Sequence, residues 1–191
     1  MKNLLVALDL EMNQPSGSII QIGAVMGNVE TGEILSSFET KVNAREELSP
    51  AIIALTKIKQ AEVDRAPPLI DAYRDLSLWL AGYAEHRVLN PVTWGGGDTE
   101  TLRVQLGLEL ESWAFGRRWV DAKTLYVAWR MAQGKEIAGG LAKSMTKLGL
   151  AFDGQKHNAR DDAKNTFRMY RALLQQFQNS SYIARAASAA A

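Results

Sequence analysis

The nearly uninterrupted apolar segment 4–10, with Asp9 and Glu11 at its carboxyl end, constrains the fold more than any other part of the chain. A strand this apolar is covered on both faces, which is typical of a central strand in a layered α/β protein. Asp9 and Glu11 are two residues apart, so strand geometry projects both carboxylates from the same face. Two acids on one face of a buried strand repel each other and lose hydration unless a cation or protons intervene. From these residues alone, a strand end that reaches solvent and hydrates both acids is the alternative.

Two more strands are expected soon after the first, at residues 18–25 and 34–42, with a turn at 30–33 between them. The short connections favour an antiparallel meander of these three strands. Strands followed by helices with interposed short strands predict an α/β layer fold, and argue against a barrel or a bundle. Start signals and the helical spacing of apolar side chains predict helices at 50–55, 70–80, 98–106, 125–132, 141–148 and 158–177, with short strands at 87–94 and 119–120.

The size of the chain, 191 residues with 47% hydrophobic content, is that of one globular domain. We expect this domain to span residues 1–178. Residues 179–191 are rich in alanine and present no apolar face, so we expect a frayed or added tail.

Charge and cysteine content narrow the function classes. The 22 basic and 21 acidic side chains leave a formal net charge of +1, so any binding of a polyanion has to be local. The chain has no cysteine, which excludes a disulfide scaffold, a thiolate zinc site and a cysteine nucleophile, and favours a reducing cytoplasm. No apolar stretch of about 18 residues is present, so no membrane span is predicted.

Asp98 follows the run Gly95-Gly96-Gly97 and precedes a predicted helix. An aspartate in this position is a good N-cap, and capping is its simplest interpretation. The glycines lack the lysine of a P-loop and the spacing of a dinucleotide-binding fingerprint. They are better suited to a sharp turn or to close approach of the backbone.

His157 and Asp162 mark the start of the last predicted helix. On a helical wheel Asp162 falls at the edge of the apolar arc and points toward the body of the protein, whereas Asp161 points away. The basic side chains of this helix lie on the far side and form a solvated face. For His157 the alternative is a loop histidine bonded to a carbonyl, and His86 has the features of a surface residue.

Taken in order, an Asp-x-Glu strand end, an aspartate after a mid-chain strand and a His-x4-Asp helix start resemble the DEDDh group of 3′–5′ exonucleases. These proteins belong to the DnaQ-like superfamily and have an RNase H-like fold, and the RNase T-like and Eri-like domains are the most similar. The resemblance extends to the segments 19–25, 48–50, 55–58 and 121–125. The chain departs from the group at Asn13, where Thr or Ser is usual, and at Lys57, which replaces the glycine of a Leu-Thr-Gly segment.

The resemblance implies an α/β protein of RNase H-like fold, with a mixed central sheet of an antiparallel meander plus parallel strands, flanked by helices. It implies that Asp9, Glu11, Asp98 and Asp162 hold two divalent cations, Mg²⁺ or Mn²⁺, and that His157 is the general base. Clustered carboxylates are the oxygen ligands such ions prefer, and a pair of these ions supports in-line hydrolysis of a phosphodiester. Met12, Asn13, Leu55 and Ile58 would contact the terminal nucleotide.

The implied activity is hydrolysis at single-stranded 3′ ends of RNA or DNA, with release of nucleoside 5′-monophosphates. The implied partner is a nucleic-acid 3′ end, with no membrane, and a homodimer is left open. Two alternatives are retained: a non-catalytic nucleic-acid- or partner-binding domain of the same fold, and an RNase H-like endonuclease.

Overall fold

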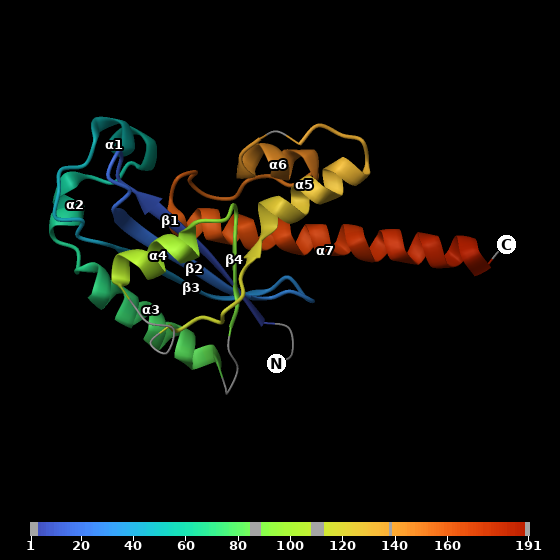
Figure 1. Cartoon of the computed structure of the whole chain (residues 1–191), viewed down its shortest axis with the longest axis horizontal. Coiled ribbons are helices and arrows are strands. Elements are labelled where there is room, and N and C mark those ends of the chain that lie inside the picture. Colours follow the sequence, from blue (N-terminus) through green and yellow to red (C-terminus); the bar gives the residue numbers. More distant parts are fainter. Residues whose placement is uncertain (1–3, 85–88, 108–112, 138, 190–191) are drawn as a thin grey trace.

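A computed structural model describes residues 4–84, 89–107, 113–137 and 139–189 (Figure 1). Its five strands form one sheet in the order β3-β2-β1-β4-β5. The strands are β1 (Leu4–Met12), β2 (Ile19–Asn28), β3 (Ile34–Lys41), β4 (Pro91–Thr93) and β5 (Val120–Asp121). The first three pair antiparallel, whereas β4 and β5 join them in parallel. The predicted mixed sheet, a meander plus parallel strands, is confirmed.

Helices cover both faces of the sheet (Figure 1). On one face lie α3 (Leu69–Ala84) and α4 (Asp98–Leu106), and on the other lies α7 (Ala159–Ala189). Two helices, α5 (Ala122–Ala132) and α6 (Leu141–Lys147), pack on α7. The short helices α1 (Pro50–Thr56) and α2 (Gln60–Asp64) enclose a separate apolar cluster with Ile20 at the start of β2.

The alternation of side chains along β1 places the two acids. Val6, Leu8 and Leu10 pack into the core beneath α3 and α4, whereas Ala7 packs beneath α7. Because successive side chains of a strand point to opposite faces, Asp9 and Glu11 continue the row that faces α7. The two acids therefore share one face, as their spacing predicts.

The first turn of α7 touches the backbone of β2 at a glycine. A β-carbon built on Gly23 would lie 2.1 Å from the carbonyl carbon of Ala159, so any larger residue would push the helix away. In the sheet, Gly23 pairs with Asp9. This close approach brings the start of α7 beside the acids of β1.

Two segments differ from expectation. The last helix continues to Ala189 rather than ending near 177, in keeping with the high helix propensity of its alanines. The strand expected at 87–94 is confined to Pro91–Thr93 in the part of the chain that the structure describes, and residues 85–88, with His86, lie outside that part. Among the described residues, no helix is both long enough and apolar enough to cross a membrane.

Candidate active site

The four predicted carboxylates come from three elements that meet at one edge of the sheet. Asp9 and Glu11 lie at the carboxyl end of β1, and Asp98 begins α4 shortly after the parallel strand β4. Asp162 lies in the first turn of α7. Parallel strands that end at the same edge commonly form a ligand site there. Residues far apart in the sequence are thus brought to a common point.

The four carboxylates influence one another's ionisation. Burial raises the pKa of Asp9 well above its usual range, and the negative charges of Asp98, Asp162 and Glu11 raise it further. Burial and the charges of Asp162 and Asp98 raise the pKa of Glu11 to about 8. A neighbouring positive charge would lower these pKa values. Because they are raised, the positive charges of the protein do not balance the carboxylates of the site.

Asp98 and Asp162 are perturbed in the same direction. Burial and the neighbouring charge of Asp121 raise the pKa of Asp98 to about 7. Burial also raises the pKa of Asp162, although a hydrogen bond from the backbone N–H of His157 partly offsets it. All four acids therefore resist ionisation in the folded protein unless a positive charge is added.

Hydrogen-bond donors are absent from most of this cluster. Within the described ranges, no group donates a hydrogen bond to Asp9, Glu11 or Asp98, and no cation pairs with them. Glu11 is buried and the other two are half-buried. Carboxylates that have lost hydration and have no protein partner fit a hard divalent cation, which takes oxygen ligands and supplies the missing positive charge. The donor set is therefore suited to Mg²⁺ or Mn²⁺.

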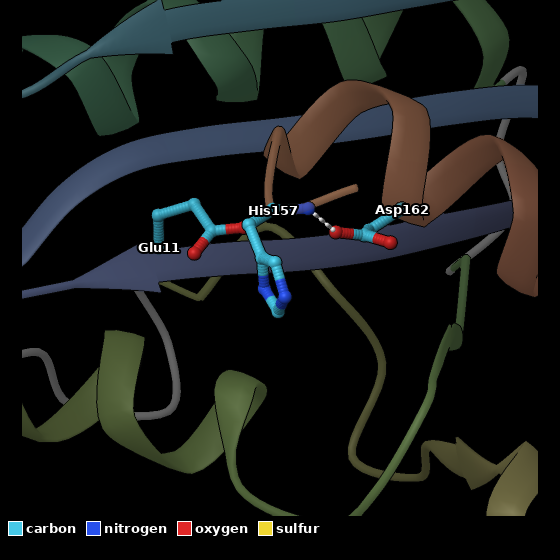
Figure 2. A group of neighbouring side chains, drawn as sticks. All are labelled: Glu11, His157 and Asp162. Atoms are coloured by element: carbon cyan, nitrogen blue, oxygen red, sulfur yellow. Dashed lines mark hydrogen bonds between the residues drawn. The ribbon is translucent and has the colours of Figure 1, made fainter. Parts of the chain in front are cut away.

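His157 lies beside two of the acids, as Figure 2 shows. Its backbone N–H donates a hydrogen bond of 2.7 Å to Oδ2 of Asp162. One ligand atom from each of Glu11, His157 and Asp162 lies within 4.8 Å of the others. His157 is exposed and has a left-handed backbone, with φ of 60°, which turns the chain sharply just before α7. The imidazole is thus open to solvent at the edge of the acid cluster.

A cavity of about 280 Å³ opens at this point. Its lining includes both acids of β1, the histidine that precedes α7, the aspartate in the first turn of α7, and the start of α6. The lining residues are Asp9, Leu10, Glu11, Trp94, Gly140, Leu141, His157 and Asp162. The cavity gives a small ligand access to the cluster.

The capping interpretation of Asp98 is wrong, because α4 begins at Asp98 itself and its N-cap is Gly97. A different acid near the site does cap a helix. Asp121 accepts hydrogen bonds from the N–H groups of Lys123 and Thr124 at the start of α5, and its Oδ1 also holds the N–H of Gly95. The Asp-x-x-Thr spacing at 121–124 is the sequence signal of this cap.

The four residues expected to contact a nucleotide fall into two groups. Met12 is half-buried at the end of β1, and Leu55 on α1 is 46% exposed. Ile58 is 4% exposed, within the apolar cluster of α1 and α2. Asn13 is 3% exposed and its amide is fully used. The Asn13 side chain bonds Oε1 of Glu46, the carbonyl of Glu47 and the N–H of Ser49.

Asn13 and Ile58 therefore offer almost no surface to a ligand in this structure. Asn13 instead ties the end of β1 to the segment that opens α1. Contact with a nucleotide stays a prediction for Met12 and Leu55.

Comparison with known proteins identifies the family. The family model described as Exonuclease (RNase_T) matches residues 6–170. The human "ERI1 exoribonuclease 2" is 29% identical over 176 residues, which cover 79% of this chain and 24% of that protein. The mouse "3'-5' exoribonuclease 1" is 27% identical over 166 residues, covering 82% of this chain and 47% of the relative. The chain thus spans between a quarter and a half of these relatives.

Among solved structures, the nuclease domain of 3'hExo, described as a DEDDh family member bound to rAMP, superposes with a TM-score of 0.78. The match covers 91% of this chain and 92% of that domain at 23% identity, and it confirms the RNase H-like fold. Because the family model spans most of the chain, this protein belongs to the exonuclease family that the model describes.

Proposed function

We propose that this chain is a metal-dependent 3′–5′ exonuclease, which hydrolyses phosphodiester bonds at single-stranded 3′ ends of RNA or DNA and releases nucleoside 5′-monophosphates. The observation that carries the proposal is a cluster of four carboxylates beside an exposed imidazole. Glu11 is buried and the three aspartates are half-buried, and three of the four acids receive no hydrogen bond from a described residue. Membership of the exonuclease family supports it.

Asp9, Glu11, Asp98 and Asp162 would hold two divalent cations, Mg²⁺ or Mn²⁺. Four ionised carboxylates carry four negative charges, which two such cations balance, so bound metal removes the repulsion that raises their pKa values. When bound, the cations supply stabilisation of the negative charge that develops on the phosphate and its leaving oxygen.

His157 would take the proton from the attacking water. Imidazole is the side chain that exchanges protons most readily near neutral pH, which suits a general base. Its exposure at the cavity gives it access to water, while the hydrogen bond from its backbone to Asp162 fixes the loop that carries it. The main chain is thus anchored and the ring is left available.

Met12 and Leu55 would contact the terminal nucleotide, with Asn13 and Ile58 holding the surrounding backbone. Leu55 presents an exposed apolar surface against which a base or sugar can pack. Such packing tolerates any base, so little base selectivity is expected. RNA is the first substrate to test, because the relatives named above are exoribonucleases.

The test is degradation of single-stranded RNA and matched DNA carrying a label at the 5′ end, with Mg²⁺ or Mn²⁺ and with chelator. We expect a ladder that shortens from the 3′ end and is lost in chelator. Undiminished activity in chelator would contradict the metal-dependent mechanism.

Two further substrates distinguish the alternatives. Cleavage of a circular single strand would support an RNase H-like endonuclease, since a circle has no end. Tight binding of the linear oligomer without any product would support a non-catalytic binding domain.

A further inference from the structure

A buried amide lies where β2 meets the start of α7. Gln21 is 1% exposed and pairs with Glu11 in the sheet, so the two side chains point to the same face. The Oε1 atom of Gln21 accepts a hydrogen bond of 3.1 Å from the backbone N–H of Ala159. Its Nε2 atom donates a bond of 2.7 Å to Oε1 of Glu39 on β3. Both ends of the amide are therefore engaged.

Glu39 extends this contact to the neighbouring residues of α7. The same Oε1 atom accepts a hydrogen bond of 3.3 Å from the side-chain amide of Asn158, and Oε2 pairs with Arg160 at 3.0 Å. Asn158 in turn caps the helix, since its Oδ1 accepts a bond of 3.1 Å from the N–H of Asp161. Residues 158–161, which separate His157 from Asp162, are thus held from two strands of the sheet.

The helix start needs such partners. The first N–H groups of a helix have no acceptor within it, and Ala159 is buried, so water does not replace a lost partner there. A slip of one residue would rotate Asp162 about 100° around the helix axis. The hydrogen bond from the Ala159 N–H to Gln21 is therefore a contact that can set the register of α7 against β1.

We propose that Gln21 is a positioning residue, which fixes the first turn of α7 so that His157 and Asp162 face Glu11. The proposal rests on the function proposed above, because it assigns these side chains to the active site. Its chemical basis is the polarity of an amide, which offers an acceptor to Ala159 and a donor to Glu39. A carboxylate at residue 21 would keep the acceptor but would place two negative groups in contact with each other.

The test exchanges the two side chains. In Gln21→Glu the new carboxylate faces Glu39, the turn is displaced, and we expect kcat to fall by about 10²-fold with KM for the oligonucleotide little changed, as misplaced catalytic groups do. In the double variant Gln21→Glu with Glu39→Gln, the donor moves to residue 39 and the acceptor for Ala159 remains. We expect the double variant to recover part of the lost activity, since Glu39→Gln also removes the negative charge that pairs with Arg160.

Binding of Mn²⁺, followed by calorimetry without nucleic acid, provides a second readout, because Asp162 is a proposed ligand. We expect weaker binding in Gln21→Glu and recovery in the double variant. Ser36→Ala is the matched control: it removes the hydrogen bond from Nε1 of Trp79 to β3 on the opposite face of the sheet, and should leave kcat and Mn²⁺ binding unchanged.

Normal kcat and Mn²⁺ binding in Gln21→Glu, or a double variant no better than the single one, would overturn the proposal. If Gln21→Glu does not fold, a folded double variant that binds Mn²⁺ supports the pairing and an unfolded one refutes it. A parent protein that binds Mn²⁺ but degrades no nucleic acid would instead refute the proposed function, and the Mn²⁺ comparison would still decide the positioning role.

Discussion

Two kinds of carboxylate lie at the same edge of the sheet, and they differ in what surrounds them. Burial alone would raise the pKa of Asp121, but hydrogen bonds from Thr124, Gly95 and Lys123 outweigh it and lower that pKa. Asp9 and Glu11, at the end of β1, receive no such donors from the described residues, and their pKa values rise. The protein therefore stabilises the ionised form of Asp121 and offers no such donors to Asp9 and Glu11, for which the proposed cations would supply the positive charge. Under the proposed function, this difference separates a structural carboxylate from a functional one more clearly than residue type does.

The largest effect is expected for Asp9→Asn. The substitution removes a proposed metal ligand, and we expect the exonuclease rate to fall by several orders of magnitude. At pH 8 and without metal, the same change removes repulsion from a crowded site, so the free energy of unfolding should rise by at least about 1 kcal/mol.

Initial rates on a labelled oligomer and thermal unfolding in chelator measure the two effects of Asp9→Asn. Glu11→Gln serves as a second example from the same strand. A variant that loses both activity and metal-free stability would show that Asp9 supports the fold, and would remove the contrast with Asp121.

The next effect in size is expected for His157→Ala. Loss of a general base lowers the rate by about 10²–10⁴-fold. Because the hydrogen bond to Asp162 comes from the backbone N–H of residue 157, the variant keeps it, and Mn²⁺ binding measured by calorimetry should change little. A variant as fast as the parent at its pH optimum would exclude His157 as the base.

The pH dependence of metal-free stability follows from the raised pKa values. Folding raises the pKa of Glu11 from its ordinary value of 4.5 to about 8, and the pKa of Asp98 from 3.8 to about 7. Between these limits the folded state holds protons that the unfolded chain has released, so the free energy of unfolding falls as pH rises. Each such proton contributes about 1.4 kcal/mol per pH unit at most, and at this chain length 1 kcal/mol corresponds to about 2–4 °C in Tm.

We therefore expect Tm in chelator to decline from pH 5 to pH 8.5, and Mg²⁺ or Mn²⁺ to restore it at the upper end. The decline should be shallower in Asp9→Asn. A metal-free Tm that stays level or increases over this range would mean that the acids are already neutralised by the protein.

Much of this arrangement follows from sequence periodicity. The alternation along β1 is local, so it places Asp9 and Glu11 on one face without knowledge of the rest of the chain. The helical wheel likewise directs Asp162 inward. Periodicity does not show which residues each of these side chains contacts. Asp98 has the local features of a cap, yet the helix starts one residue earlier than that interpretation requires. Its carboxylate instead acts on the ionisation of Asp9.

The sequence does not indicate contacts between distant residues. Asn13 bonds residues 33 to 36 positions away, and these contacts bury its side chain. Gln21 and Ala159 are 138 positions apart, so an amide within an apolar strand gives no local indication of its role. The five-residue helix α2 was not predicted, because it is too short to show a helical period.

The smallest effect is expected at Asp121. Here the change from Asp to Asn tests the acid whose ionised form the protein itself stabilises. In Asp121→Asn the remaining amide oxygen can still accept bonds from Gly95 and Lys123, so we expect the free energy of unfolding to change by about 0.5 kcal/mol or less and the rate by less than an order of magnitude. Asp121→Ala, which removes every acceptor, should cost about 1 kcal/mol. Chemical denaturation of the three proteins in chelator measures this. If Asp121→Asn abolished activity while remaining folded, Asp121 would belong with the functional acids, and hydrogen-bond satisfaction would no longer distinguish the two kinds of carboxylate.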